Sequence, residues 1–425
     1  MNELLELYNH KPIKIYLFKS EYNAQLINVD NKLFIQLTDY VNHGIKRKID
    51  KNFKFAYGKI EDRDITFFGL YRTKIISKGE QYVLTYLLDS FVDGMRIANK
   101  DTTKKVKTID FEFYSIPEFS NMNITKYEKN FTFSFPSYYK TYDFDDYSLL
   151  INIGATCGEE DRCRFYAHRE ILFKFSYKTK VTIDKVILDI AVFRNFLSLT
   201  SKRKIGIERI ELNQGVILFM NFLYYQDKSY RNESQNIHHR LFLLTLEDLS
   251  DNFELVYKKY LSLYDDMFSI TEIYYDLKND EPSKKNVFLN YTQILEEISK
   301  KFDSENVKAI RDKHLKNNPK RPENVTLSDR LESIINQVKN IWGFRETTIE
   351  KISSRIARGR NYYIHHKDKK DELNYHQLTL YSFFLEDVFI GYIYLQLDIP
   401  KKKIKEALDF NIYFPQKKEI IKISK

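Results

Sequence analysis

A short run near the C-terminus combines the residue types that RNA cleavage without a metal would need. This run, RGRNYYIHH, spans Arg358–His366. RNA carries its own nucleophile in the 2′-hydroxyl. A histidine such as His365 exchanges protons near neutral pH, and the guanidinium of Arg360 can bind phosphate oxygens and stabilise developing charge. Asn361 could orient the histidine or bind the substrate. The predicted products are a 2′,3′-cyclic phosphate and a 5′-hydroxyl, and the chemistry requires no metal or other cofactor.

The arginine-to-histidine spacing does not by itself identify a site, because a similar spacing recurs along the chain. It occurs at Arg162 and His168, at Arg231 and His238, and at Arg358 and His365. The first pair lies in a strand-rich stretch and the second in a polar linker. Only the third pair lies on a predicted amphipathic helix, so the helical context selects it.

Helical geometry favours His365 over His366 as the reactive histidine. Asn361 and His365 are four residues apart, so they lie about 40° apart around a helix axis. Arg360 is about 140° from His365, so the two would flank a common groove, and His366 is about 140° from Asn361. Two copies facing each other across a dimer would double this sparse site. The alternative is a solvated helix end, where positive charge is favourable.

The motif is predicted to lie on one of several long helices in the C-terminal half. Ile349, Ile352 and Ile356 share one face, Tyr363 continues that face, and the helix should end near His366. The other predicted helices are Leu241–Asp251, Phe253–Lys278, Lys285–Phe302, Leu327–Val338, Leu378–Leu397 and Ile404–Leu408.

Two features mark the segment before Leu327. The stretch HLKNNPKRPEN, His314–Asn324, is predicted to be a basic loop. Thr326 is followed three residues later by Asp329, which is an acceptable if weak helix start.

The first half is predicted to consist of short strands rich in β-branched and aromatic residues. These strands are Ile13–Phe18, Phe53–Tyr57, Ile65–Leu70, Tyr82–Leu88, Phe111–Tyr114, Phe131–Phe135, Leu149–Ile153, Ile171–Phe175, Ile205–Leu212 and Ile217–Tyr225. One helix interrupts them, with Thr182 as its cap and Val186, Ile190, Phe193 and Leu197 at helical spacing.

The polar segment Gln226–Asn236 is the predicted domain boundary. The fold class is therefore α+β. A β-rich N-terminal domain, residues 1–235 with one or two helices, precedes an all-α helical bundle, residues 236–425.

Charge and cysteine content set weaker bounds. Lys and Arg number 68 against 59 Asp and Glu, and the formal net charge of +9 is compatible with an acidic partner such as nucleic acid. Cys157 and Cys163 are too few for a disulfide framework or a four-ligand zinc site. A three-ligand metal site with His168 is conceivable, but ordinary thiols in a reducing cytoplasm are favoured.

No segment predicts secretion or membrane insertion. The N-terminus lacks the basic and apolar pattern of a signal peptide. The apolar stretch Tyr381–Leu397 is interrupted by Glu386 and Asp387, so we expect a buried amphipathic helix rather than a membrane span. The expected location is the cytoplasm.

The motif and its surroundings resemble a known family. RNYYIH, Arg360–His365, is similar to the R-N-x-x-x-H motif of HEPN domains. NVFLNYTQILEEISKKF, Asn286–Phe302, and TLSDRLESII, Thr326–Ile335, resemble helices of ApeA-type HEPN proteins. Upstream segments that resemble the β-rich ApeA N-terminal domain are Phe67–Thr73, Asp110–Asn121 and Asp184–Leu212.

The resemblance implies a bacterial anti-phage protein that acts by abortive infection. It implies a toxic HEPN ribonuclease, with an RNA substrate such as tRNA, held inactive until a phage-derived trigger appears. The N-terminal domain would sense or control, and a homodimer or higher homo-oligomer is expected. By the same resemblance Arg360, Asn361 and His365 are catalytic.

Further candidate site residues are less well defined. His366 and Arg358 belong to the same run as the motif. Either Glu296 or Glu297 occupies the place where such proteins often have an acidic residue, and the sequence leaves open which one.

Two other functions remain open. One is a non-catalytic HEPN module that binds RNA or a protein in a defence or toxin–antitoxin complex. The other is a defence protein directed at DNA, which the basic charge permits. The sequence has no obvious acidic cluster to bind the metal that DNA hydrolysis usually uses.

Overall fold

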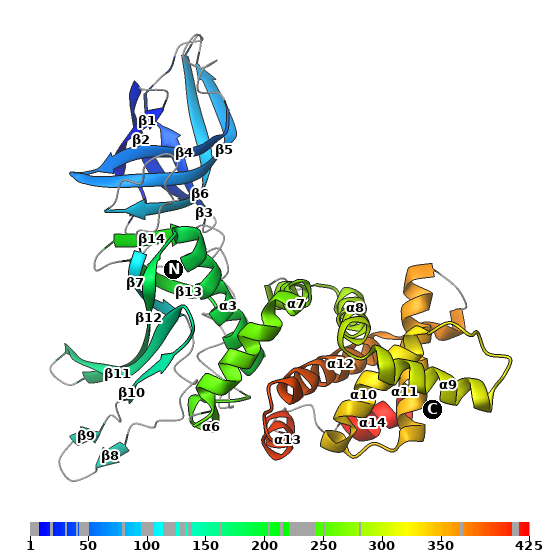
Figure 1. The fold of residues 1–425 in the computed structure, drawn as a ribbon. Helices are drawn as coiled ribbons and strands as arrows, with labels where there is room; N and C mark the ends of the chain where they lie inside the picture. Colours follow the sequence, from blue (N-terminus) through cyan, green and yellow to red (C-terminus); the bar gives the residue numbers. More distant parts are fainter. Residues whose placement is uncertain are drawn as a thin grey trace. The chain divides into compact units, whose positions relative to one another are not determined.

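The computed structural model forms two compact units. It describes residues 8–17, 20–29, 32–39, 41, 51–78, 81–94, 106–113, 125–127, 132–134, 138–161, 164–202, 205–212, 216–220, 243–249, 251–279, 282–365, 369–409 and 416–424. A β-rich unit comprises Met1–Arg194 and Ile205–His239, and a helical unit comprises Asn195–Lys204 and Arg240–Lys425 (Figure 1). The predicted α+β class, with a β-rich region before a helical one, is confirmed. The predicted linker Gln226–Asn236 lies outside the described residues.

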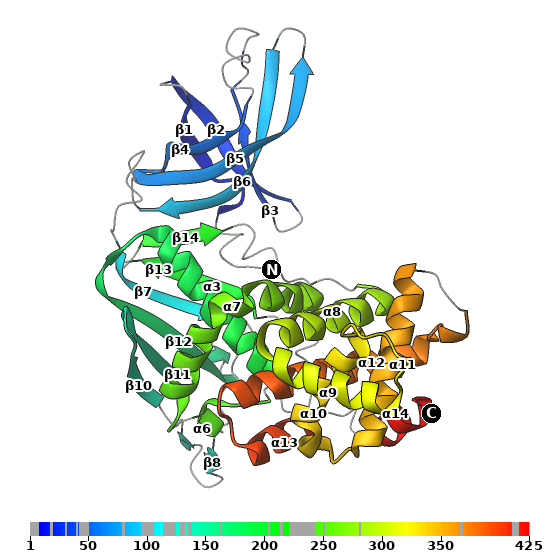
Figure 2. The ribbon, with the colours of Figure 1, turned by 45° about the vertical axis from the view of Figure 1, so that its right-hand side comes forward.

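Six strands of the β-rich unit close into a barrel, drawn in blue in Figures 1 and 2. They are β1 (Pro12–Leu17), β2 (Ser20–Val29), β3 (Lys32–Leu37), β4 (Phe53–Ile60), β5 (Arg63–Lys78) and β6 (Gln81–Asp93). The ring order is β1-β2-β3-β6-β5-β4, and all pairs are antiparallel. Ile13, Ile15 and Leu17 alternate with exposed residues along β1, so side chains on one face of the strand form core.

The sheet continues beyond the barrel from β6 as an open arm. Its strands are β7 (Val106–Phe113), β10 (Tyr138–Asp143), β11 (Tyr147–Asp161), β12 (Arg164–Val181), β13 (Ile207–Leu212) and β14 (Val216–Met220). They run in the order β6-β14-β13-β7-β12-β11-β10. A separate short hairpin pairs β8 (Thr125–Tyr127) with β9 (Thr132–Ser134). Helix α3 (Ile183–Ser201) packs on the arm, and Thr182 Oγ1 accepts a hydrogen bond from Lys185 N at 3.2 Å, as its predicted capping role requires.

The sequence predicted most of these strands but missed β2, β3, β8 and β10. The pattern of β2 shows why, because among its ten residues only Ala24 and Leu26 are buried and the rest is largely polar. The predicted strand Ile217–Tyr225 is confirmed as far as Met220, and its remainder lies outside the described residues.

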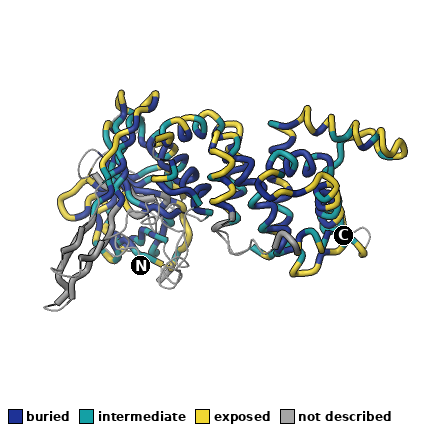
Figure 3. The backbone as a smooth tube through the Cα atoms, turned by 90° about the horizontal axis from the view of Figure 1, so that it is seen from below, coloured by how far each residue is buried: buried dark blue, intermediate teal, exposed yellow. Residues whose placement is uncertain are grey.

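The helical unit is built around one buried helix. Its helices are α6 (Leu246–Leu249), α7 (Phe253–Asn279), α8 (Lys284–Phe302), α9 (Ser304–Asn317), α10 (Leu327–Trp342), α11 (Glu346–His365), α12 (Tyr375–Gln396), α13 (Lys401–Asp409) and α14 (Gln416–Ile423), with a 3-10 turn η2 (Lys369–Asp371). Helix α12 contacts α8, α10, α13 and α14. Figure 3 shows buried backbone inside each unit and exposed stretches outside.

The predicted amphipathic character of α12 is wrong. The helix is buried on nearly every side because neighbouring helices surround it. By length and composition it could cross a membrane, but 78% of its apolar window is buried in the helical unit, as expected of a core helix.

Two other predictions in this unit need correction. Within the described residues, the helix predicted at Leu241–Asp251 is the four-residue α6, which begins after Thr245 because Thr245 and Asp248 form a cap there, with Thr245 N donating to Asp248 Oδ2 at 2.9 Å. The loop predicted at His314–Asn324 begins later, since α9 extends to Asn317. Helix α9 buries only Val307 and His314, so it presents no apolar stripe that a sequence reading could find.

Candidate active site

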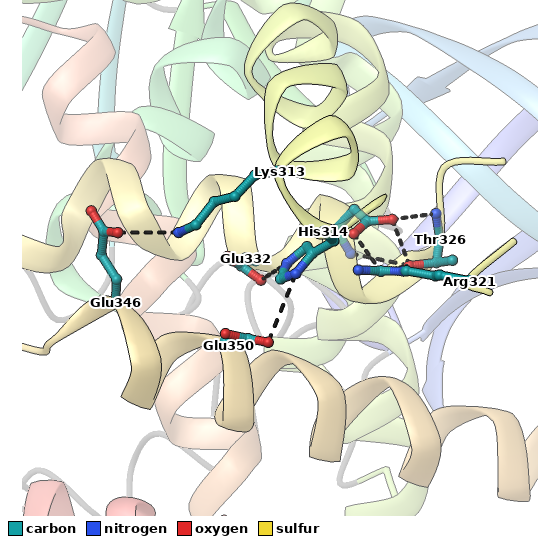
Figure 4. A network of polar contacts seen from close by, with 8 residues as sticks. Lys313, His314, Arg321, Thr326, Glu332, Glu346 and Glu350 are labelled. Atoms are coloured by element: carbon teal, nitrogen blue, oxygen red, sulfur yellow. Dashed lines mark hydrogen bonds and ion pairs between the residues drawn. The ribbon is translucent and has the colours of Figure 1, made fainter. Parts of the chain in front are cut away.

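Charged contacts tie the first turns of α11 to the helices before it (Figure 4). Glu346 pairs with Lys313 of α9 at 3.2 Å and with Lys339 of α10 at 3.1 Å. His314 of α9 points toward two carboxylates, with Nε2 2.8 Å from Glu332 and Nδ1 3.7 Å from Glu350. The N-terminal half of α11 is therefore fixed by both α9 and α10.

A capping box fixes the start of α10, where the sequence predicted one. Thr326 N donates to Asp329 Oδ2 at 2.8 Å, and Asp329 N donates to Thr326 Oγ1 at 3.3 Å. Arg321 neutralises the buried Asp329 through a contact of 2.5 Å. Gly343 then ends α10 in the left-handed region at φ 62°, which lets the chain turn into α11.

The apolar face of α11 holds the helix against the core. Ile349, Ile352 and Ile356 are fully buried, as predicted. Gly359 extends this contact, since a Cβ there would lie 2.6 Å from Leu373 Cδ1 and 2.8 Å from its Cγ. The glycine within the RGRN run therefore allows Leu373 to pack directly on the motif helix, a role that the sequence analysis missed.

The segment after η2 is bonded along the same side of α11. Arg355 donates from Nη1 to Asp371 O and from Nη2 to Glu372 O, both at 3.1 Å. Tyr363 OH donates to Leu373 O one turn beyond Gly359. These bonds fix the segment that leads from the motif into α12.

Arg360 is held by a carboxylate of the neighbouring helix α8. Its Nη2 lies 3.4 Å from Glu296 Oε2, and its Nη1 donates to Asn361 Oδ1 at 3.5 Å. The Arg360 side chain is 26% exposed, so the guanidinium is anchored but still open to solvent. The structure thus brings together Arg360, Asn361 and Glu296.

The same helix distinguishes the two glutamates that the sequence left open. Lys300 pairs with Glu296 at 3.1 Å and with Glu297 at 2.8 Å. Among the described residues, Lys300 is the one charged partner of Glu297. Glu296 is therefore the acidic residue next to the motif. Lys300 is a neighbouring cation, and the one feature of the sequence that indicates it is its position four residues after Glu296.

His365 lies one helical turn beyond Asn361, at the end of α11. It is the last residue of α11 and is exposed, and in the described part of the chain it has no hydrogen-bond or ion-pair partner. His366 lies outside the described residues. Arg358 is 54% exposed, and its Nε lies 3.9 Å from Asp371. On an ideal helix the positions of Arg360 and His365 lie about 140° apart around the axis of α11.

Two family models match the chain, one over each half. The model described as ApeA N-terminal domain 1 matches residues 23–260, which is more than half of the chain, and the model described as Apea-like HEPN matches residues 266–403. The chain belongs to the ApeA family. The resemblance expected from RNYYIH and its flanking segments is confirmed, and the helical unit of this ApeA-family member contains the HEPN domain of an antiviral defence protein.

Other comparisons add little to the family assignment. No curated protein matches the chain. A solved structure described as the Borreliella burgdorferi PlzA protein in complex with c-di-GMP is 9% identical, with coverage of 44% of this chain and 88% of that chain and a TM-score of 0.14. A likeness at this TM-score carries no argument about fold or ligand.

Proposed function

We propose that this ApeA-family chain is a metal-independent endoribonuclease whose site contains Arg360, Asn361 and His365. The observation that carries the proposal is the placement of the three residues at one end of α11. There Arg360 is anchored by Glu296 and Asn361, and His365 is exposed to solvent. A cation and a proton-transfer group at an open helix end suit phosphodiester cleavage by the 2′-hydroxyl.

Each residue has a distinct role in this mechanism. His365 takes the proton of the 2′-hydroxyl or returns one to the leaving 5′-oxygen. Arg360 binds the phosphate oxygens and stabilises the negative charge of the pentavalent transition state. Asn361 bonds the guanidinium of Arg360 and keeps it beside the phosphate. The leaving strand ends in a 5′-hydroxyl, and the other strand ends in a 2′,3′-cyclic phosphate.

A complete site is proposed to need two copies of the chain. One copy of α11 supplies a single guanidinium and a single imidazole, which is a sparse set of groups for this reaction. Two α11 ends facing each other would supply two guanidiniums and two imidazoles. We therefore propose a homodimer, or a larger oligomer built from it, as the active form.

The setting follows from the family. We propose RNA as the substrate class, with tRNA as the first candidate, and a phage-derived trigger that acts through the β-rich unit. Cleavage of host RNA in the cytoplasm would then halt growth of the infected cell.

The test uses the purified full chain and total RNA, with and without EDTA, with extract of phage-infected cells added as the source of the trigger. Cleavage should persist in EDTA and should be lost in R360A. The matched control is R311A, because Arg311 is also a helical arginine of this unit and pairs with the adjacent Asp312 at 2.7 Å. Cleavage that requires Mg²⁺, or that R360A retains in full, would refute the proposal.

The second candidate function is a HEPN module that binds RNA or a protein without cutting. It is favoured by the arrangement within one copy, in which Arg360 is paired with Glu296 and His365 has no partner among the described residues. The same assay separates the two functions. A binding module would retain RNA in a filter or gel-shift assay while the RNA ends remain unchanged.

A further inference from the structure

One helix of the chain contributes to the cores of both units. Helix α3 is unbroken from Ile183 to Ser201, yet the units divide within it, between Arg194 and Asn195. On the β-rich side, Phe193 is fully buried against the aromatic core of the open sheet. Its ring centroid lies 5.1 Å from that of Phe173 and 6.0 Å from that of Phe113.

The last turns of α3 belong to the helical unit in the same way. The ring of Phe196 lies 5.1 Å from that of Tyr257 and 5.2 Å from that of Tyr260, both on α7. Thr200 O accepts a hydrogen bond from Leu243 N at 2.7 Å. A helical unit that began at residue 240 would lack these core contacts.

Two polar contacts fasten this end of α3 to the central helix α12. Tyr394 OH, which is buried, donates to Leu199 O at 2.9 Å. Lys202, directly after α3, forms an ion pair with Asp387, and both side chains are about 15% exposed or less. Removing one partner of a charge pair with so little solvent leaves the other charge uncompensated, so the position of Lys202 after α3 is coupled to that of Asp387 on α12.

The contacts continue from α12 to the arginine of the motif. Glu386, adjacent to Asp387, is 5% exposed and accepts a hydrogen bond from Tyr274 OH of α7 at 3.5 Å. Tyr291 of α8 also bonds Glu386, and burial raises the pKa of Tyr291, so this phenol stays a donor. Helix α8 then presents Glu296 to Arg360.

We propose that α3 is the element through which the β-rich unit controls the Arg360 site. A change in the sheet that moves Phe193 would alter the fastening of α3 to α12, and α12 bears directly on the helix that anchors Arg360. Contiguous packed contacts are a physical route for such coupling, and its size must be measured. The inference rests on the proposed nuclease function for its activity readout, but its structural readout is independent of that function.

The experiment compares two conservative core variants of the full chain, F193L and F67L. Both phenylalanines are fully buried in the β-rich unit, but Phe67 lies in the barrel and Phe193 on α3. Amide hydrogen exchange is measured in α12 and α8, and RNA cleavage is measured in parallel. We expect F193L to speed exchange around Glu386–Tyr394 at least about fivefold and to change the cleavage rate, while F67L does neither.

The outcomes separate this inference from the proposed function. Equal exchange in α12 for F193L, F67L and the unaltered chain would overturn the role of α3, whatever the RNA assay shows. If the unaltered chain cuts no RNA even with extract of phage-infected cells added as the source of the trigger, the nuclease proposal fails while the exchange data still decide the role of α3. The variant D387N offers a second measurement, because it should loosen α12 in the same region while the sheet exchanges as before.

Discussion

The two halves of α11 differ in how they are held. The N-terminal half is bound on several sides by Lys313, Lys339 and His314, and its isoleucines are fully buried. At the C-terminal end Arg360 has one anchoring carboxylate and His365 is exposed. The difference indicates that a rigid first half aims a reactive end that remains accessible to substrate, as precise functional sites require.

The sharpest test of this comparison removes the exposed imidazole. H365A should lower RNA cleavage about 10²–10⁴-fold, the range typical of losing a general acid–base group. Its stability should stay within about 0.5 kcal/mol of the unaltered chain, because an exposed helix end contributes little to folding. Single-turnover cleavage and thermal unfolding check the two halves of this prediction.

The matched control for that variant is H376A. His376 lies on the first turn of α12 and is also exposed, and it pairs weakly with Glu419 at 3.8 Å. H376A should cut RNA at the normal rate. Equal losses for both histidines would mean that His365 has no special role.

A steric change directly before Arg360, where Leu373 packs on α11, should act through stability. G359V places a branched side chain where Leu373 already lies within 2.8 Å of a Cβ, so we expect it to cost about 1–3 kcal/mol. Denaturant unfolding measures this cost. When G359V is combined with L373A, the additional cost of G359V should be much smaller than in the unaltered chain. If the costs of the two substitutions simply add, the Gly359–Leu373 contact is not the cause.

The anchoring carboxylate should have a smaller effect on cleavage. E296Q keeps the shape of the side chain but removes the charge that orients Arg360, so cleavage should fall about three- to tenfold. E297Q is the matched control, because Glu297 pairs with Lys300 and not with Arg360. Rate constants at saturating RNA distinguish the two variants, and an equal effect of both would contradict the assigned role of Glu296.

The smallest expected effect concerns pH and the fixed end of α11. Burial raises the pKa of Glu332, partly offset by its bond to His314. Just above the ordinary pKa of a glutamate, the folded state therefore binds more protons than the unfolded state. The contribution of Glu332 to the free energy of unfolding falls as the pH rises through that interval. Thermal unfolding across that pH interval should show that the melting temperature of E332Q falls less with rising pH than that of the unaltered chain. Parallel curves would exclude this contribution.

The sequence predicted those parts of the fold and site that depend on local pattern. The α11 face formed by Ile349, Ile352 and Ile356, the cap at Thr326 and most strands followed from spacing alone. Helix α9 was not predicted because it buries so few side chains. Helix α6 begins later than predicted because Thr245 and Asp248 form a cap that sets its start.

Other features depend on tertiary contacts and could not be predicted. Glu296 and Glu297 are equivalent in sequence, and only the position of α8 beside α11 shows that Glu296 reaches Arg360. The same is true of Leu373, which lies against Gly359 from a different segment. The division of α3 between two cores likewise needed the three-dimensional contacts.

The chemical identity of the RNA ends tests the central claim most directly. Total RNA cut by the full chain in EDTA is ligated or labelled so as to report its termini. The account predicts 2′,3′-cyclic phosphates and 5′-hydroxyls that disappear in H365A but not in H376A. Ends bearing 5′-phosphates and 3′-hydroxyls, or RNA left uncut at every protein concentration when extract of phage-infected cells is present as the source of the trigger, would contradict it.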